Sequence, residues 1–148
     1  MPQKDQVNIL RTAVGIRDMA HLSELQTHFR TKDYDGQSVV VATTRRAPRQ
    51  SDDIIATGGS VYWIIKNVIQ ARQKIVDLTL VEEADGSKFC QILMEPQIIR
   101  TQTRKKRAIQ GWRYLKGADA PEDIGPFNPS DDSLPPEMEE ELRALGIV

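Results

Sequence analysis

Residues 78–94 read LTLVEEADGSKFCQILM, and this stretch decides the fold class. Two runs rich in aliphatic and aromatic residues, 78–82 and 88–94, flank the pair Asp85-Gly86. Asp and Gly tolerate the positive φ angles that tight turns need, so the stretch predicts two antiparallel strands joined by a two-residue turn. We therefore expect a protein built around an antiparallel hairpin.

Similar patterns on either side of the hairpin predict further strands at 7–14, 38–44, 61–65, 98–103 and 109–115. Pro96 interrupts the pairing that follows the hairpin because proline has no N–H to donate, and 98–103 can resume it. The segment 67–78 fits a helical stripe at first and a strand near its end, so we expect a short helix or turn leading into a strand.

Helical signals are fewer. Asp18 can cap a helix that runs to about Phe29, because Met19, Leu22 and Leu25 recur at helical spacing. Residues 32–36 form a polar turn cluster, and 45–59 form a long polar connection with one expected helical turn at 52–56. Long connections inside compact domains are uncommon and are often functional.

These elements predict an α+β protein. We expect a mostly antiparallel curled sheet or small β-barrel of about seven strands, with a helix after the first strand. The length of 148 residues suits one hydrophobic core.

The composition excludes several classes. A single cysteine cannot form an internal disulfide, so a secreted disulfide scaffold is excluded and a cytoplasmic protein is expected. The apolar runs are far shorter than the roughly 20 residues of a membrane span, and Lys4, Asp5 and Arg11 interrupt any apolar signal region. His21 and His28 lie too far apart to chelate one metal ion, so neither a metal nor a cofactor is expected.

The formal net charge of −1 conceals an uneven distribution. Residues 1–117 carry 19 basic and 12 acidic side chains, whereas 118–148 carry 1 and 9 together with five of the eight prolines. We expect a basic core domain at 1–117 and an acidic, Pro-rich tail at 118–148, with a short helix capped by Ser133. The tail could serve solubility, dock on the basic body, or bind a protein partner.

Basic residues with aromatic neighbours are the best organised chemical feature. Clustered cations bind nucleic acids by releasing counterions from phosphates, and aromatic rings can stack on exposed bases. We therefore predict RNA or single-stranded nucleic-acid binding through a basic groove, with Tyr62 as a further stacking candidate. The predicted contact residues are Arg45, Arg46, Arg49, Lys66, Arg72, Arg104, Lys105, Arg107, Trp112, Arg113 and Tyr114.

Two other functions stay open. The protein could be an interaction module that uses its acidic tail. It could also be a hydrolase or transferase acting on a nucleotide or RNA, with Asp52, Asp53 or Glu82 near the basic loop. No complete catalytic motif is present, because the glycines of Gly58-Gly59-Ser60 precede a strand and lack the Lys-Ser/Thr of a phosphate loop, so no catalytic residue is assigned.

Several blocks of sequence resemble a known family. They are Thr44-Arg45-Arg46-Ala47-Pro48-Arg49, Gly58-Gly59-Ser60-Val61-Tyr62-Trp63-Ile64-Ile65-Lys66, Arg72-Gln73-Lys74-Ile75 and Gln110-Gly111-Trp112-Arg113-Tyr114-Leu115. The chain resembles the alphaproteobacterial domain of unknown function 1489 family from residue 7 to about 123. More loosely, the order of loop, glycine turn, aromatic strand and hairpin is similar to small barrels of the pseudouridine-synthase-and-archaeosine-transglycosylase superfamily. That second resemblance implies binding of RNA or modified nucleotides.

Overall fold

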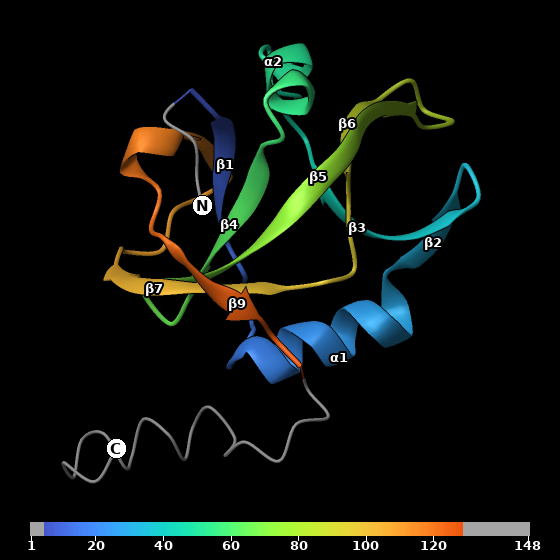
Figure 1. Ribbon diagram of the computed structural model, residues 1–148. Coiled ribbons are helices and arrows are strands. Elements are labelled where there is room, and N and C mark those ends of the chain that lie inside the picture. The colour runs from blue at the N-terminus through green and yellow to red at the C-terminus, as the bar shows by residue number, and fades with distance from the viewer. Residues whose placement is uncertain (1–4, 129–148) are drawn as a thin grey trace, which may run out of the picture.

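The computed structural model describes residues 5–128 (Figure 1). The helices are α1 (Met19–Phe29), α2 (Ser51–Ala56) and a 3-10 turn, η1 (Gly117–Asp119). The nine strands of this part of the chain are β1 (Val7–Thr12), β2 (Thr31–Tyr34), β3 (Gln37–Thr44), β4 (Ser60–Ile65), β5 (Val68–Glu82), β6 (Lys88–Met94), β7 (Ile99–Lys105), β8 (Trp112–Lys116) and β9 (Asp123–Pro126).

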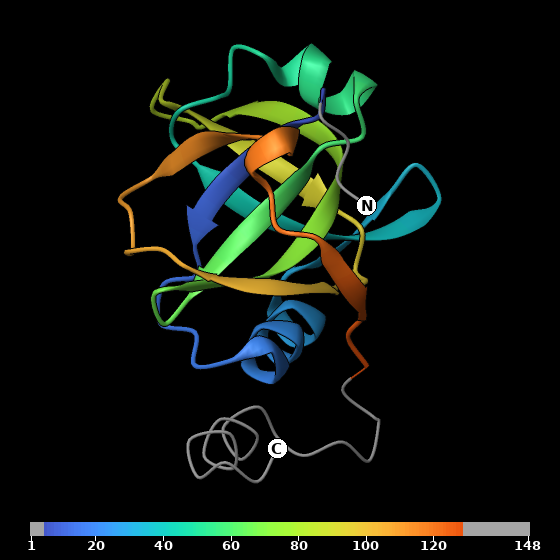
Figure 2. The same cartoon turned by 60° about the vertical axis from the view of Figure 1, so that its left-hand side comes forward.

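The strands form one mixed sheet in the order β2-β3-β6-β5-β4-β1-β8. Off this path, β7 pairs with β5, and β9 pairs with β7. β1 pairs with β4 in parallel, and the other described pairs are antiparallel. The end strands β2 and β8 do not pair with each other, so the sheet curls without closing into a barrel. α1 lies at one end of the curled sheet and α2 at the other (Figure 2).

β5 is 15 residues long and organises the fold. Its first half pairs with β4 and with β7, and its second half pairs with β6. The strands β6 and β7 therefore follow one another along β5, and the break between them contains Pro96. The predicted hairpin, and the predicted resumption of pairing after Pro96, are both confirmed.

Of the two alternatives predicted for residues 67–78, the turn is confirmed and the helix is not. Lys66 and Asn67 adopt positive φ angles of 50° and 63° and form a tight turn straight into β5. The two-residue turn predicted for the hairpin is wrong. At Asp85-Gly86 the connection is longer than two residues. The N–H of Gly86 donates to the carbonyl of Glu83 at 3.0 Å, and Gly86 itself has a φ of 87°. This combination is typical of a type I turn followed by a bulge.

The strand count of seven was too low, because two short strands lie in polar sequence. β2 and β3 form a hairpin around Asp35-Gly36, within the stretch expected to be only a turn. β9 lies in the segment after Gly117 that was expected to be tail, yet it pairs with β7. The sequences of β2 and β9 lack the apolar alternation that predicts a strand. Main-chain pairing with the neighbouring strands holds them in the sheet.

The core is built by the alternation of side chains along the strands. Ile9, Val61 and Trp63 point into the main apolar cluster, which α1 covers with Met19 and Leu22. The opposite face of the same strands forms a smaller cluster, which contains Leu10, Tyr62 and Ile64. All six residues of β4 are buried, so β4 is covered on both faces.

An ion pair ties β9 to β5. Arg72 donates from Nε and Nη2 to the two carboxylate oxygens of Asp123, at 2.8 and 2.7 Å, and from Nη1 to the Ser60 hydroxyl at 2.9 Å. The two charged side chains are only 20% and 18% exposed. Hydrogen bonding to Arg72 holds the pKa of Asp123 below its usual value.

Because the carboxyl pKa is lower in the folded protein, this pair stabilises the fold above the pKa of the unfolded carboxyl, near 4. The stabilisation disappears as the pH falls through the lower pKa of the folded state. Asp123→Asn should therefore reduce the free energy of unfolding by about 1 kcal/mol at pH 7, and the difference from wild type should shrink below pH 4. Urea denaturation at several pH values measures this.

Asp33→Asn, on the exposed strand β2, is the matched control and should leave the free energy of unfolding unchanged. An Asp123→Asn effect that stays the same from pH 7 to pH 2.5 would show that the pair does not supply the stabilisation.

Candidate functional site

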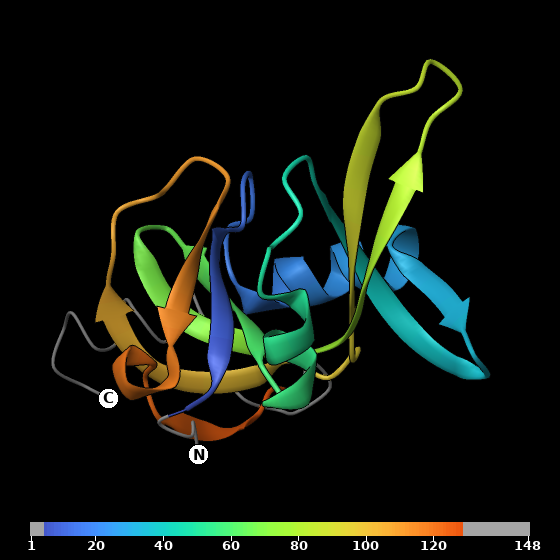
Figure 3. The same cartoon turned by 90° about the horizontal axis from the view of Figure 1, so that it is seen from above.

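A groove of about 970 Å³ opens on the face where several loops meet. The connection between β3 and α2 lies between β8 and β1 on one side and the projecting β5–β6 hairpin on the other (Figure 3). The described residues that line the groove include five cations and two carboxylates. They are Arg11, Arg45, Arg46, Lys88 and Arg113, with Glu83 and Asp85.

Arg11 occupies an unusual position on β1. In the sheet register it lies opposite Trp63 of β4 on one side and Trp112 of β8 on the other. Because side chains alternate along a strand, Arg11 points to the same side as Ile9 and Ala13, which belong to the core. The only cation on this core face of β1 is therefore Arg11.

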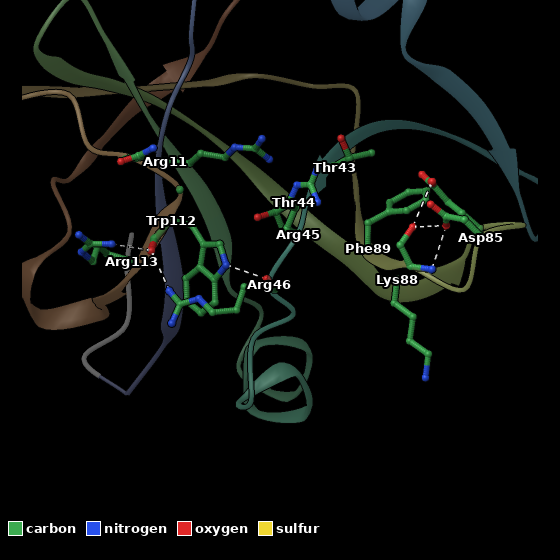
Figure 4. Close-up of a pocket in the computed structure, with 14 residues that line it drawn as sticks. Arg11, Thr43, Thr44, Arg45, Arg46, Asp85, Lys88, Phe89, Trp112 and Arg113 are labelled. Carbon is green, nitrogen blue, oxygen red and sulfur yellow. Dashed lines mark hydrogen bonds between the residues drawn. The ribbon is translucent and has the colours of Figure 1, made fainter.

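The guanidinium of Arg11 is partly desolvated and has no counter-ion among the described residues. Its Nη1 atom is buried and has no hydrogen-bond partner among residues 5–128. Burial lowers the pKa of Arg11 from its ordinary value. A buried charge is unfavourable unless it is paired, so Arg11 is a candidate anion-binding group. In Figure 4 its side chain extends from β1 into the groove.

Arg46 and Trp112 hold the β3–α2 connection against β8. The indole Nε1 donates to the Arg46 carbonyl at 2.8 Å, and Nη2 of Arg46 donates to the Trp112 carbonyl at 3.2 Å (Figure 4). The Arg46 guanidinium also lies over the Trp112 ring, 4.1 Å from its centroid. These three contacts fix the loop that carries Arg45, so the groove has a firm wall.

The aromatic rings in and near the groove differ in how far they are exposed. Trp112 is 2% exposed and covered by Arg46, and Tyr114 packs edge-on against it at 4.8 Å. Tyr62 is 1% exposed, and burial raises its pKa to about 12. Phe89 of β6 is half-buried and borders the groove directly.

The structure brings together four of the residues that the sequence predicts as nucleic-acid contacts, namely Arg45, Arg46, Trp112 and Arg113. The others do not line the groove. Arg72 faces Asp123, and Arg104 donates to the Asp119 carbonyl. Lys66 lies near the end of β7, since Val68, two residues later in the chain, pairs with Lys105. The predicted residues outside the groove are Arg49, Lys66, Arg72, Arg104, Lys105, Arg107 and Tyr114.

Arg11, Lys88 and Phe89 are among the groove residues that sequence reasoning did not predict as contacts. One signal was available for Arg11, because a lone cation between Leu10 and Ala13 interrupts an apolar strand. Phe89 could not be assigned from its sequence neighbours. It reaches the groove only because β6 pairs with β3, which precedes the Arg45 loop.

Acidic groups border the groove at the tip of the β5–β6 hairpin. The Ser87 hydroxyl donates to Asp85 at 2.6 Å and to Glu83 at 3.2 Å, and the Ser87 N–H donates to Asp85 at 2.9 Å. These hydrogen bonds lower the pKa of Asp85, so it is ionised near neutral pH. In residues 5–128 no group of three His, Cys, Asp or Glu side chains is placed to hold a metal ion.

Comparison with known proteins identifies the family. The family model described as "Protein of unknown function (DUF1489)" matches residues 9–148. The chain belongs to the DUF1489 family. The predicted membership is confirmed, and all the residues that line the groove lie within the matched region. Neither the search of curated proteins nor the search of solved structures found a match. No helix in residues 5–128 of this DUF1489 protein is long and apolar enough to cross a membrane.

Proposed function

We propose that this DUF1489 protein binds RNA or another single-stranded nucleic acid in the groove. The observation that carries the proposal is the convergence of two distant basic segments, 45–46 and 113, around Arg11 and its unpartnered Nη1 atom. Cations gathered in one groove attract a polyanion more strongly than the same cations spread over a surface.

The groove residues have different roles in this proposal. Arg11 and Arg45 bind phosphate. The Nη1 atom of Arg11 has no partner in the part of the chain that the structure describes, and Arg45 is exposed on the anchored loop. Arg46 mainly positions the loop, because its guanidinium already contacts Trp112. Phe89 offers a ring edge or face to an unstacked base, which a single strand presents and a regular duplex does not.

The two other functions have less support. Asp52, Asp53 and Glu82 do not line the groove, and Asp85 is ionised and hydrogen-bonded, so it is poorly suited to donate a proton near neutral pH. The segment 129–148, which holds most of the acidic tail and its expected helix, lies outside the described residues.

The proposal predicts salt-dependent binding of a labelled oligouridine. Plotted as log K against log salt concentration, fluorescence anisotropy data should have a slope of about −0.7 for each phosphate contact. Arg45→Ala should lower affinity about tenfold and make the slope shallower by about 0.7, because one contact is lost.

The double variant Glu83→Gln/Asp85→Asn should bind the same oligouridine about threefold more tightly, because two charges that repel phosphate are removed.

Arg17→Ala is the matched control, since Arg17 is also an exposed arginine but lies outside the groove. Its affinity should equal that of wild type. Binding that is absent, or that weakens equally in Arg17→Ala and Arg45→Ala, would contradict a specific groove.

A further inference from the structure

A second, smaller cavity adjoins the groove. It has a volume of about 190 Å³ and lies between α1, the end of β1 and β3. Arg11 and Thr43 line both the groove and this cavity, so the two meet at the Arg11 side chain. Most of its lining residues are apolar, among them Ile16, Leu22, Leu25, Val41, Ala42 and Trp63.

We propose that this cavity, which we call the base pocket, holds one unstacked base of a strand bound in the groove. The inference rests on the proposed function and adds how the protein holds the bound nucleic acid. An apolar cavity beside an unpaired cation suits a ligand with an anionic part and a flat heterocyclic part. A nucleotide has both, with its phosphate at Arg11 and its base among the apolar side chains.

Trp63 gives the base pocket a fixed wall. Its indole Nε1 donates to Oε1 of Gln73 at 2.9 Å. Gln73 and Gln26 then exchange side-chain hydrogen bonds, at 2.7 and 2.9 Å, and Gln73 also donates to the Glu95 carbonyl at 3.1 Å. This buried network joins β4, β5 and α1. It holds the indole in one orientation before any ligand binds, which lowers the entropy lost on binding.

The polar groups of that network are already engaged, so the ring faces of a base would meet apolar side chains and Trp63. Recognition of the base edge would fall to Thr43 and Arg30 at the rim, both exposed. Extruded bases are commonly held in this way, between aromatic and apolar side chains with a few polar contacts at the edge.

The test compares two labelled strands of equal length, an oligouridine and a fully abasic sugar–phosphate strand. Ala42→Phe fills the base pocket without changing any charge. We expect wild type to bind the oligouridine about tenfold more tightly than the abasic strand. Ala42→Phe should abolish this preference while leaving binding of the abasic strand unchanged. Leu25→Trp, on α1, fills the same pocket from another side and guards against a folding defect in one variant.

The two proposals fail in different ways. If wild type binds neither strand, the proposed function and the base pocket are both wrong. If wild type binds the oligouridine and both filled variants, each with a wild-type circular dichroism spectrum, keep the full preference for bases, the base pocket is wrong and the groove stands.

Discussion

Replacing Arg11 by methionine should lower the affinity for a single-stranded oligonucleotide about 100-fold while raising the free energy of unfolding by about 1 kcal/mol. Arg11 lies on the core side of β1, with Trp63 and Trp112 as its neighbours across the strands. Methionine has a similar length and fills irregular apolar space well, so the substitution keeps the packing and removes the desolvated charge.

The loss of affinity and the gain in stability have the same origin, the buried Nη1 atom of Arg11. In the free protein the buried Nη1 atom has no partner among the described residues, which destabilises the fold. In the complex a phosphate oxygen satisfies the same atom within a site of low dielectric, where the interaction is strong. Part of the guanidinium is solvated, so the gain in stability should lie at the lower end of the range for buried charges.

Urea denaturation and anisotropy titration of the same samples measure both effects. Arg113→Met is the control, since Arg113 lines the groove but is exposed, and it should lower affinity less than tenfold without stabilising the protein. A loss of stability in Arg11→Met would show that Arg11 has a structural role that the contacts do not reveal.

Gly59→Ala should destabilise the protein by about 3 kcal/mol or more, which lowers the melting temperature by roughly 10 °C. A Cβ atom at this position would lie 2.0 Å from the carbonyl oxygen of Val7 and 3.1 Å from Cγ2 of Ile54. The backbone cannot easily move away. Gly59 donates to the Ile54 carbonyl at 2.8 Å and accepts from the Ile75 N–H at 3.0 Å.

Gly36→Ala is the comparison, because Gly36 has a φ of +84° but nothing within 4 Å of an added Cβ. It should lose only about 1 kcal/mol, the usual penalty for a side chain in the left-handed region. Thermal unfolding followed by circular dichroism measures both variants. Equal losses in the two would show that the close approach to Val7 does not account for the glycine at 59.

Local patterns predicted those parts of the fold that depend on local chemistry. Asp18 accepts from the His21 N–H at 2.8 Å at the start of α1, and the short helix α2 includes the turn expected at 52–56. The missed strands β2 and β9 are held by main-chain hydrogen bonds to β3 and β7, and such pairing leaves almost no trace in side-chain composition. β2 and β9 can be recognised only once their partner strands, β3 and β7, are placed.

The candidate site was predicted only in part, for a related reason. Arg45 and Arg46 belong to a visible basic run, and they do reach the groove. The run at 104–107 is more conspicuous in sequence, but it lies at the end of β7 and not in the groove. Arg11 and Phe89 come from β1 and β6, and only the curling of the sheet brings them near the β3–α2 connection. Charge density along the chain therefore did not predict which basic residues gather in the groove.

The most direct test of the groove is an NMR titration of the full-length, ¹⁵N-labelled protein with oligouridine. Amide and arginine side-chain signals should shift in four segments that only the fold brings together, at residues 11, 43–46, 87–89 and 110–113. The signals of Lys66 and of 104–107 should stay in place. Shifts confined to Lys66 and 104–107, or no shifts at millimolar oligonucleotide and low salt, would contradict nucleic-acid binding in the groove.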